Sequence, residues 1–173
     1  MSPPTLRGDG VVLRPLTDSD AEALFVAHGD AGVHHFWSGP ALTDVTETQR
    51  YNADTIEMAD GRVWAITEAG GEALGRLALF VRREGVAEIG LLLRRAAQGR
   101  GLAAKALALV DGYAFNDLGL HRVYADVDVD NAASLALFER AGYQREGLLR
   151  GHWKTHIGVR DSVILGKVRL SGE

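Results

Sequence analysis

The sequence has no cysteine. Without thiols the chain has no disulfide framework, no thiolate metal site and no cysteine nucleophile. It also lacks an apolar run that approaches the ~20 residues of a membrane-spanning helix, and its first residues have no apolar core of the kind found in signal peptides. We therefore expect no membrane partner and a cytoplasmic protein.

Excess positive charge is missing as well. The formal net charge is −4, so there is no electrostatic reason to expect nucleic acid as a partner. What the chain does have is ordinary globular composition, with 46% hydrophobic and 24% charged residues. Its 173 residues suit one domain, and its 21 glycines are scattered without repeat or linker. We predict a single domain over residues 1–173.

Hydrophobic periodicity and turn signals predict alternating groups of strands and helices. The strands are expected at residues 6–16 (with a glycine turn at 8–10), 63–67, 74–82, 86–93, 122–127, 144–153 and 159–169. The helices are expected at about residues 17–28, 43–60, 102–116 and 131–141. Neither a regular βαβ repeat nor an all-β pattern fits this order. We predict an α/β (α+β) fold, a mixed and mostly antiparallel sheet of about seven strands flanked by about four helices.

The most informative segment is residues 88–105, an apolar strand followed by a basic stretch, two glycines and a strong helix. Gly99 and Gly101 allow the backbone to come close to a ligand. The N–H groups at the start of the following helix form an anion site, and Arg94, Arg95 and Arg100 add positive charge. This combination predicts a phosphorylated ligand without saying which one.

Two known phosphate-binding patterns compete for this loop. Gly99-x-Gly101-x-x-Ala104 matches the dinucleotide pattern, and Asp126 ends the next strand where a ribose-binding acid would lie. However, residues 94–98 separate the strand from the first glycine, whereas that pattern needs the turn directly after the strand. The P-loop pattern fails because no Gly-Lys-Ser/Thr follows.

A third pattern extends over two segments of the chain. Gln98-Gly-Arg-Gly101-Leu-Ala103 resembles the Q/R-x-x-G-x-G/A pyrophosphate loop of the GNAT N-acetyltransferase superfamily. Residues 128–143, with an N-x-x-S at Asn131, a leucine-rich helix and a closing Gly142-Tyr143, resemble the second cofactor segment of that superfamily. This version is similar to the ribosomal-protein-alanine N-acetyltransferase (RimJ/RimL-like) branch. The likeness covers roughly residues 6–170.

The resemblance implies a GNAT fold whose parallel central strands, 86–93 and 122–127, splay apart around the pantetheine arm of acetyl-CoA. It implies acetyl-CoA as the cosubstrate. We expect no metal, because the adjacent His34 and His35 have no second His/Asp/Glu cluster at ligand spacing. The cofactor-binding residues that it implies are Leu91, Leu92, Leu93, Gln98, Gly99, Arg100, Gly101, Leu102, Ala103, Asn131, Ser134 and Phe138. Asn131 would cap its helix in addition.

Acetylation of an amine needs an unprotonated nitrogen, a polarised thioester carbonyl and a proton for the leaving thiolate. Many GNAT members place a tyrosine for that proton on the helix where this chain has Phe138, which cannot donate one. On the resemblance, Ser134 is the expected acid, or hydrogen-bond donor to the sulfur. Glu88 is the expected base, acting through water, and a charge on the sheet surface is the alternative.

The acceptor amine would contact the first two helices, their connection and the late hairpin. The expected substrate-binding residues are His34, His35, Phe36, Trp37, Tyr51, Glu88 and Trp153, with His152 and His156 nearby. The branch favours a protein or peptide N-terminus as acceptor, with a polyamine, aminoglycoside or amino-acid derivative as the alternative.

A non-catalytic acyl-CoA-binding module is a further alternative, supported by Phe138 and Trp153 in place of chemically useful groups. An exposed edge on a closing strand is where two copies would pair into a homodimer.

Overall fold

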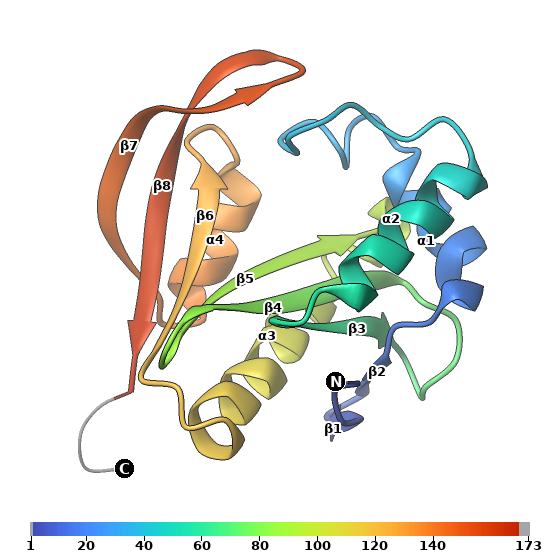
Figure 1. Cartoon of the computed structure of the whole chain (residues 1–173), viewed down its shortest axis with the longest axis horizontal. Coiled ribbons are helices and arrows are strands. Elements are labelled where there is room, and N and C mark those ends of the chain that lie inside the picture. Colours follow the sequence, from blue (N-terminus) through green and yellow to red (C-terminus); the bar gives the residue numbers. More distant parts are fainter. Residues whose placement is uncertain (1, 170–173) are drawn as a thin grey trace.

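The computed structural model describes residues 2–169, in which eight strands form one sheet with the order β1-β2-β3-β4-β5-β6-β8-β7 (Figure 1). The strands are β1 (Leu6–Gly8), β2 (Val11–Pro15), β3 (Gly61–Thr67), β4 (Gly75–Arg83), β5 (Val86–Leu93), β6 (Arg122–Asp128), β7 (Gln144–Thr155) and β8 (Gly158–Val168). All neighbours are antiparallel except β5 and β6. Leu170, the end of the expected likeness, lies outside the described residues.

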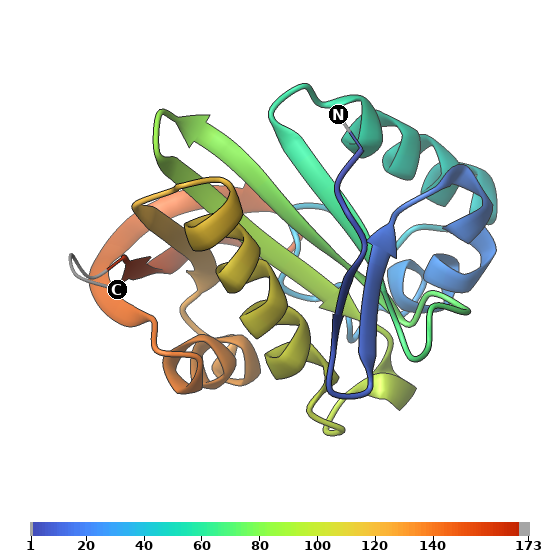
Figure 2. The same cartoon turned by 90° about the horizontal axis from the view of Figure 1, so that it is seen from below.

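Within the described residues, four α-helices cover the sheet. They are α1 (Ala21–His28), α2 (Val45–Glu57), α3 (Leu102–Gly112) and α4 (Ala132–Arg140). Figure 2 shows α1 and α2 on one side of the sheet, with α3 and α4 on the other. No helix of residues 2–169 is both long and apolar enough to cross a membrane.

The predicted fold class is confirmed, with one strand more than expected. The turn at Gly8-Asp9-Gly10 divides the first predicted strand into β1 and β2, and Gly10 has the positive φ of 74° that such a turn favours. The third predicted helix, at residues 102–116, is observed as α3 followed directly by a π-helical turn at Tyr113–Asp117.

The sheet separates two apolar layers. The larger cluster of buried residues joins α3 and α4 to the alternate side chains of the strands, such as Leu77 and Leu79 of β4. The smaller cluster packs Leu24 of α1 against Ala78 and other residues on the opposite face. Residues of one strand alternate between these two layers, as the two-residue period of a strand requires.

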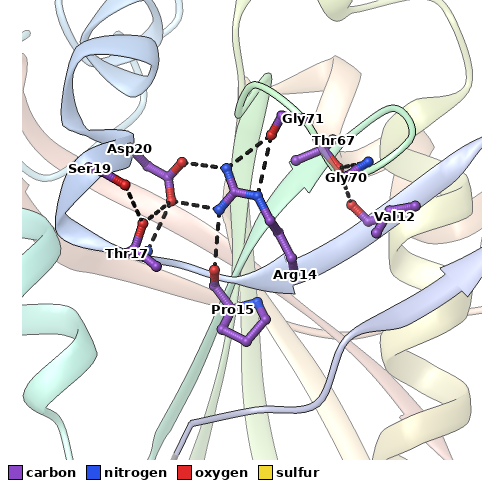
Figure 3. Close-up of polar contacts among 9 residues, drawn as sticks. All are labelled: Val12, Arg14, Pro15, Thr17, Ser19, Asp20, Thr67, Gly70 and Gly71. Atoms are coloured by element: carbon purple, nitrogen blue, oxygen red, sulfur yellow. Dashed lines mark hydrogen bonds and ion pairs between the residues drawn. The ribbon is translucent and has the colours of Figure 1, made fainter.

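An ion pair fixes the start of α1 to the sheet (Figure 3). Arg14 of β2 donates two hydrogen bonds to the carboxylate of Asp20, at 2.9 and 2.5 Å, and a third to the carbonyl of Gly71 at 3.0 Å. Asp20 also accepts from the backbone N–H of Thr17 at 2.9 Å. Burial alone raises the pKa of Asp20, but the hydrogen bonds from Arg14 and Thr17 outweigh burial, and the pKa lies below its ordinary value.

The two parallel strands pair over only a short stretch. Their register joins Val86 to Arg122, Ala87 to Val123 and Glu88 to Tyr124, and no further pair follows. Yet β5 continues to Leu93 and β6 to Asp128, and Figure 1 shows the two strands diverging. The expected splay between these strands is therefore present, and it begins directly after Glu88.

Candidate active site

A cavity of about 1120 Å³ occupies the opening between β5 and β6. Its walls come from both strands, from the N-terminal end of α3 and from α4, and on the other side from α2, β4 and residues of the loop between α1 and α2. Of the residues expected to bind cofactor or substrate, those that border it are Glu88, Leu91, Leu92, Leu93, Gln98, Gly99, Gly101, Leu102, Ala103, Asn131, Ser134, Phe138, Phe36, Trp37, Tyr51 and Trp153.

The glycine loop before α3 has the backbone that a close ligand approach needs. Gly99 and Gly101 have φ angles of 74° and 77°, and a Cβ atom on either would meet no atom within 4 Å. The glycines are therefore not explained by steric crowding, and their Cβ directions face open space. The side-chain amide of Gln98 donates to the carbonyl of Leu93 at 2.9 Å, which fixes the loop to the end of β5. The first N–H groups of α3 lack helical acceptors and suit an anion.

The arginines of this loop are paired with carboxylates. Arg94 bonds Glu72 at 3.0 Å, Arg95 bonds Asp30 at 2.7 Å, and Arg100 forms an ion pair with Glu68. Arg100 is absent from the residues that border the cavity, unlike the neighbouring glycines. Backbone amides, rather than these guanidinium groups, are what the loop presents to an anion.

Helix α4 brings Asn131, Ser134 and Phe138 to the opposite wall. The side-chain oxygen of Asn131 accepts from the backbone N–H of Ser134 at 3.2 Å, which is the N-cap bond that the sequence predicts. Phe138 is buried and packs edge-on against Tyr143, with ring centres 5.1 Å apart. Ser134 is thus the one hydroxyl-bearing residue that α4 contributes to the cavity wall.

Glu88 lies where the strands separate. Its Oε2 atom accepts from Nε of Arg82 at 2.8 Å and from the hydroxyl of Tyr124 at 3.2 Å. Burial, followed by the nearby charge of Glu88, raises the pKa of Tyr124, so the phenol keeps its proton and donates. The carboxylate of Glu88 is therefore held in place by two donors while its residue borders the cavity.

The two adjacent histidines do not reach the cavity wall. His34 is buried, with Nε2 3.1 Å from Nδ1 of His28, and its ring stacks on Trp37. Burial lowers the pKa of both His28 and His34, that of His28 to about 3, with Arg76 contributing to both shifts. His34 therefore supports the aromatic wall from behind, and exposed His35 packs edge-on against Phe36.

Two charged residues of the site were missed as acceptor-side candidates. Asp126 of β6 borders the cavity, and its Oδ2 atom accepts from Trp153 Nε1 at 2.9 Å and lies 3.1 Å from Nε2 of His152. Arg76 of β4 borders it as well and is almost fully buried. The signal for Arg76 was present in the sequence, because it is a lone charge inside the apolar run of residues 73–81.

No group of three metal-ligating side chains exists within residues 2–169. Among these residues, the adjacent His34 and His35 therefore have no further metal-ligating side chains that would complete a metal site.

A mixed sheet whose parallel pair opens over a glycine-rich helix start defines an acetyltransferase fold. The crystal structure of a probable acetyltransferase (GNAT family) from Chromobacterium violaceum superposes with a TM-score of 0.88 at 28% identity, covering 97% of this chain and 88% of that one. The Acetyltransferase (GNAT) domain family matches residues 11–144, and the chain belongs to this family.

Curated relatives agree with this assignment. The uncharacterized N-acetyltransferase p20 of Bacillus licheniformis is 30% identical over 156 residues, which are 87% of this chain and 88% of that protein. The probable N-acetyltransferase YjcK of Bacillus subtilis is 34% identical over 168 residues, covering 87% and 93% of the two chains. The protein is thus an N-acetyltransferase, in a family whose enzymes take the acetyl group from acetyl-CoA.

Two further similarities are to acetyltransferases with more specific names. The spermidine N(1)-acetyltransferase of Escherichia coli is 28% identical over 144 residues, 80% of this chain and 75% of that protein. The RimJ structure of Mycobacterium smegmatis, in complex with CoA-disulfide, has a TM-score of 0.82 at 24% identity, covering 95% of this chain and 86% of that one. At that identity the second similarity concerns the fold alone.

Proposed function

We propose that the chain transfers the acetyl group of acetyl-CoA to the α-amino group at the N-terminus of a peptide or protein. The observation that carries the transferase part is the opening between β5 and β6, which has an anion-binding helix start at one end and Glu88 at the other. An extended cosubstrate arm can lie along β5 there, because β6 makes no pairs with β5 beyond Glu88.

The geometry of the glycine loop supports coenzyme A as the ligand of this part of the cavity. The open space at Gly99 and Gly101 leaves room that side chains would occupy, and the adjacent amides suit a pyrophosphate. In this proposal, residues 98–103 hold the pyrophosphate, Leu91, Leu92 and Leu93 flank the pantetheine arm, and Asn131 bonds the arm.

Glu88 and Ser134 carry the proton transfers in this proposal. Glu88 removes a proton from the acceptor ammonium, directly or through water, so that the nitrogen can attack the thioester carbon. The C–N bond forms as the C–S bond breaks, and the nitrogen loses its second proton as the amide forms. That proton reaches the departing sulfur through the hydroxyl of Ser134, or it goes to solvent while Ser134 donates a hydrogen bond to the thiolate. A backbone N–H of β5 near Leu91 or Leu92 polarises the carbonyl oxygen.

The N-x-x-S segment at Asn131 and Ser134 favours a peptide acceptor, because it resembles the ribosomal-protein branch. A polyamine is the second candidate, favoured by the similarity to a spermidine acetyltransferase and by Asp54, Glu88 and Asp126 on the cavity wall.

The first experiment is calorimetric titration with acetyl-CoA, with NAD in parallel. Saturable binding of acetyl-CoA alone is expected, followed by turnover with an amine panel of N-terminal peptides and spermidine. Released CoA can be measured through its thiol without interference, because the chain has no cysteine. Folded protein that fails to bind acetyl-CoA would contradict the proposal.

The homodimer also stays a prediction. β7 lies at the edge of the sheet and exposes Leu148 and Leu149, so it is the strand that would pair with a second copy. Light scattering of the purified chain tests this point directly.

A further inference from the structure

Arg76 is a buried cation in the acceptor half of the cavity. Its side chain leaves β4 toward α2, where Nη1 donates to Thr55 Oγ1 at 3.3 Å and Nη2 donates to the hydroxyl of Tyr51 at 3.1 Å. The guanidinium also lies over the Tyr51 ring, 4.4 Å from its centre. Only 4% of the residue is exposed, yet it borders the cavity.

Within the part of the chain that the structure describes, no side chain balances the charge of Arg76. No carboxylate within residues 2–169 lies within 4 Å of its guanidinium. Its neighbours are hydroxyls, an aromatic ring, and the histidines His28 and His34, whose pKa values burial keeps low. Burial lowers the pKa of Arg76 too, but an arginine retains its proton at neutral pH.

A buried ion without a partner is strongly unfavourable. Neutral hydroxyls satisfy some of its N–H groups but do not neutralise its charge. The planar guanidinium matches a carboxylate with two parallel hydrogen bonds, which neither Thr55 nor Tyr51 can provide. An anion that binds in the cavity would balance the charge of Arg76.

The strand register places Arg76 and Glu88 on the same face of the sheet, and this face forms the floor of the cavity. Three cross-strand pairs, Arg76–Leu92, Ala78–Gly90 and Phe80–Glu88, lie in succession on the α2 face of the sheet. Ala78 is small, Gly90 has no side chain, and a Cβ added at Gly90 would meet nothing within 4 Å. The middle of the floor is therefore open, with a cation at one end and an anion at the other.

We propose that Arg76 binds a carboxylate carried by the acceptor amine, so that the preferred acceptors are amines with a nearby carboxylate. This inference rests on the proposed function, because it takes the acetyl transfer as given, and it specifies the acceptor by its carboxylate, so that free amino acids join the proposed peptides. The carboxylate end of the acceptor binds Arg76, and the ammonium end points toward Glu88, which a short acceptor reaches through water. A free amino acid and a peptide with an acidic first residue share this chemistry, whereas a polyamine lacks it.

Pairs of acceptors that differ only in this charge test the proposal. The probes are glycine and glycinamide, β-alanine and its amide, and C-terminally amidated peptides that begin with Glu or with Gln. Spermidine is the acceptor without a carboxylate. We expect kcat/KM for the acid of at least one pair to exceed that for its amide roughly 10- to 100-fold. A preference for the acid within the amino-acid pairs would show that Arg76 binds the carboxylate of a free amino acid. A preference within the peptide pair alone would show that Arg76 binds the side-chain carboxylate of the first residue.

Three variants separate binding from structural support. Arg76→Met should remove the preference by lowering kcat/KM for the acid only. Its melting temperature should stay level or rise, because an unbalanced buried charge is gone. Arg76→Lys keeps the charge without the planar fork, so it should retain part of the preference. Arg62→Met on β3 is the charge-matched control, since Arg62 does not border the cavity, and it should change nothing.

Equal rates for both members of every pair would overturn the inference. So would an Arg76→Met variant that loses activity on acids and amides alike and melts at a lower temperature, because Arg76 would then only support α2.

Calorimetry with the acetylated products distinguishes this failure from failure of the proposed function. N-acetylglycine, N-acetyl-β-alanine and the N-acetylated Glu peptide, each compared with its amide counterpart, report on the carboxylate site without any turnover. Binding of at least one acid that is lost in Arg76→Met upholds the site even if no amine is acetylated. Binding of none overturns it.

Discussion

The hydroxyl of Tyr124 donates to Glu88 Oε2 at 3.2 Å, and these two residues are also the last paired positions of the parallel strands. One contact therefore marks both the point where the sheet opens and a carboxylate whose residue borders the cavity. Arg82 holds the same oxygen from β4. The sheet thus fixes Glu88 through its neighbours on both sides, which is the arrangement that a positioned base needs.

Replacing Glu88 tests this role. Glu88→Gln keeps the size and the ability to accept a hydrogen bond but removes the proton acceptor. We expect kcat/KM to fall roughly 100-fold or more, with the largest loss at low pH, where fewer acceptor amines are already unprotonated. The pH–rate profile measures this. Arg82→Met is the control for side-chain position, and a Glu88→Gln loss that is equal at every pH would contradict a role in deprotonation.

Ser134 should act on turnover and not on cofactor binding. Its backbone N–H makes the cap bond to Asn131, and that bond survives in Ser134→Ala. We expect kcat to fall roughly 10- to 100-fold while the Kd for acetyl-CoA stays within about twofold. Steady-state kinetics and calorimetry on the same preparation separate the two quantities, and unchanged turnover removes Ser134 from the mechanism.

Gly101 should matter for cofactor affinity because of its backbone. At φ 77° an alanine is strained by about 1 kcal/mol, and its methyl group would occupy the space before α3. We expect Gly101→Ala to weaken acetyl-CoA binding about tenfold or more. Gly119→Ala is the matched control, because Gly119 has a φ of 65°, an equally open Cβ direction and no place on the cavity wall. Both variants should lose similar stability, and an equal loss of affinity would contradict the loop assignment.

Buried His28 predicts a pH dependence of stability. Burial, with Arg76 and His34 adding to it, lowers the pKa of His28 from 6.5 to about 3. Below pH 6.5 the unfolded chain therefore binds a proton there that the folded protein does not, so stability falls as pH falls. Each such proton contributes a slope that approaches 1.4 kcal/mol per pH unit.

The test is denaturant unfolding between pH 6.5 and 5. His28→Leu should reduce the slope of unfolding free energy against pH by about one proton, while the lowered pKa of His34 keeps part of the dependence. An unchanged slope would show that His28 is protonated in the folded state.

Several parts of the site could be predicted from sequence because their physics is local. Residues other than glycine rarely adopt a positive φ, so Gly99 and Gly101 in the sequence predict the turn before α3. Asn131 lies three residues before the N–H that it caps, within the same stretch of chain. The strand and helix periods follow from neighbouring residues in the same way, and they sufficed for the fold class.

The tertiary structure alone decided which side chains meet. The side chain of Arg100 was expected to add charge near the phosphates, and the structure pairs it with Glu68, 32 residues away in the sequence. His34 was expected in the pocket, but it turns inward to His28 behind Trp37. The partners of Arg76 come from α2, more than 20 residues earlier in the sequence. These partners are hydroxyl groups, which accept hydrogen bonds but do not balance the charge of Arg76. Sequence periodicity reports the face of an element, whereas the charge balance of a site depends on contacts between elements that are distant in the chain.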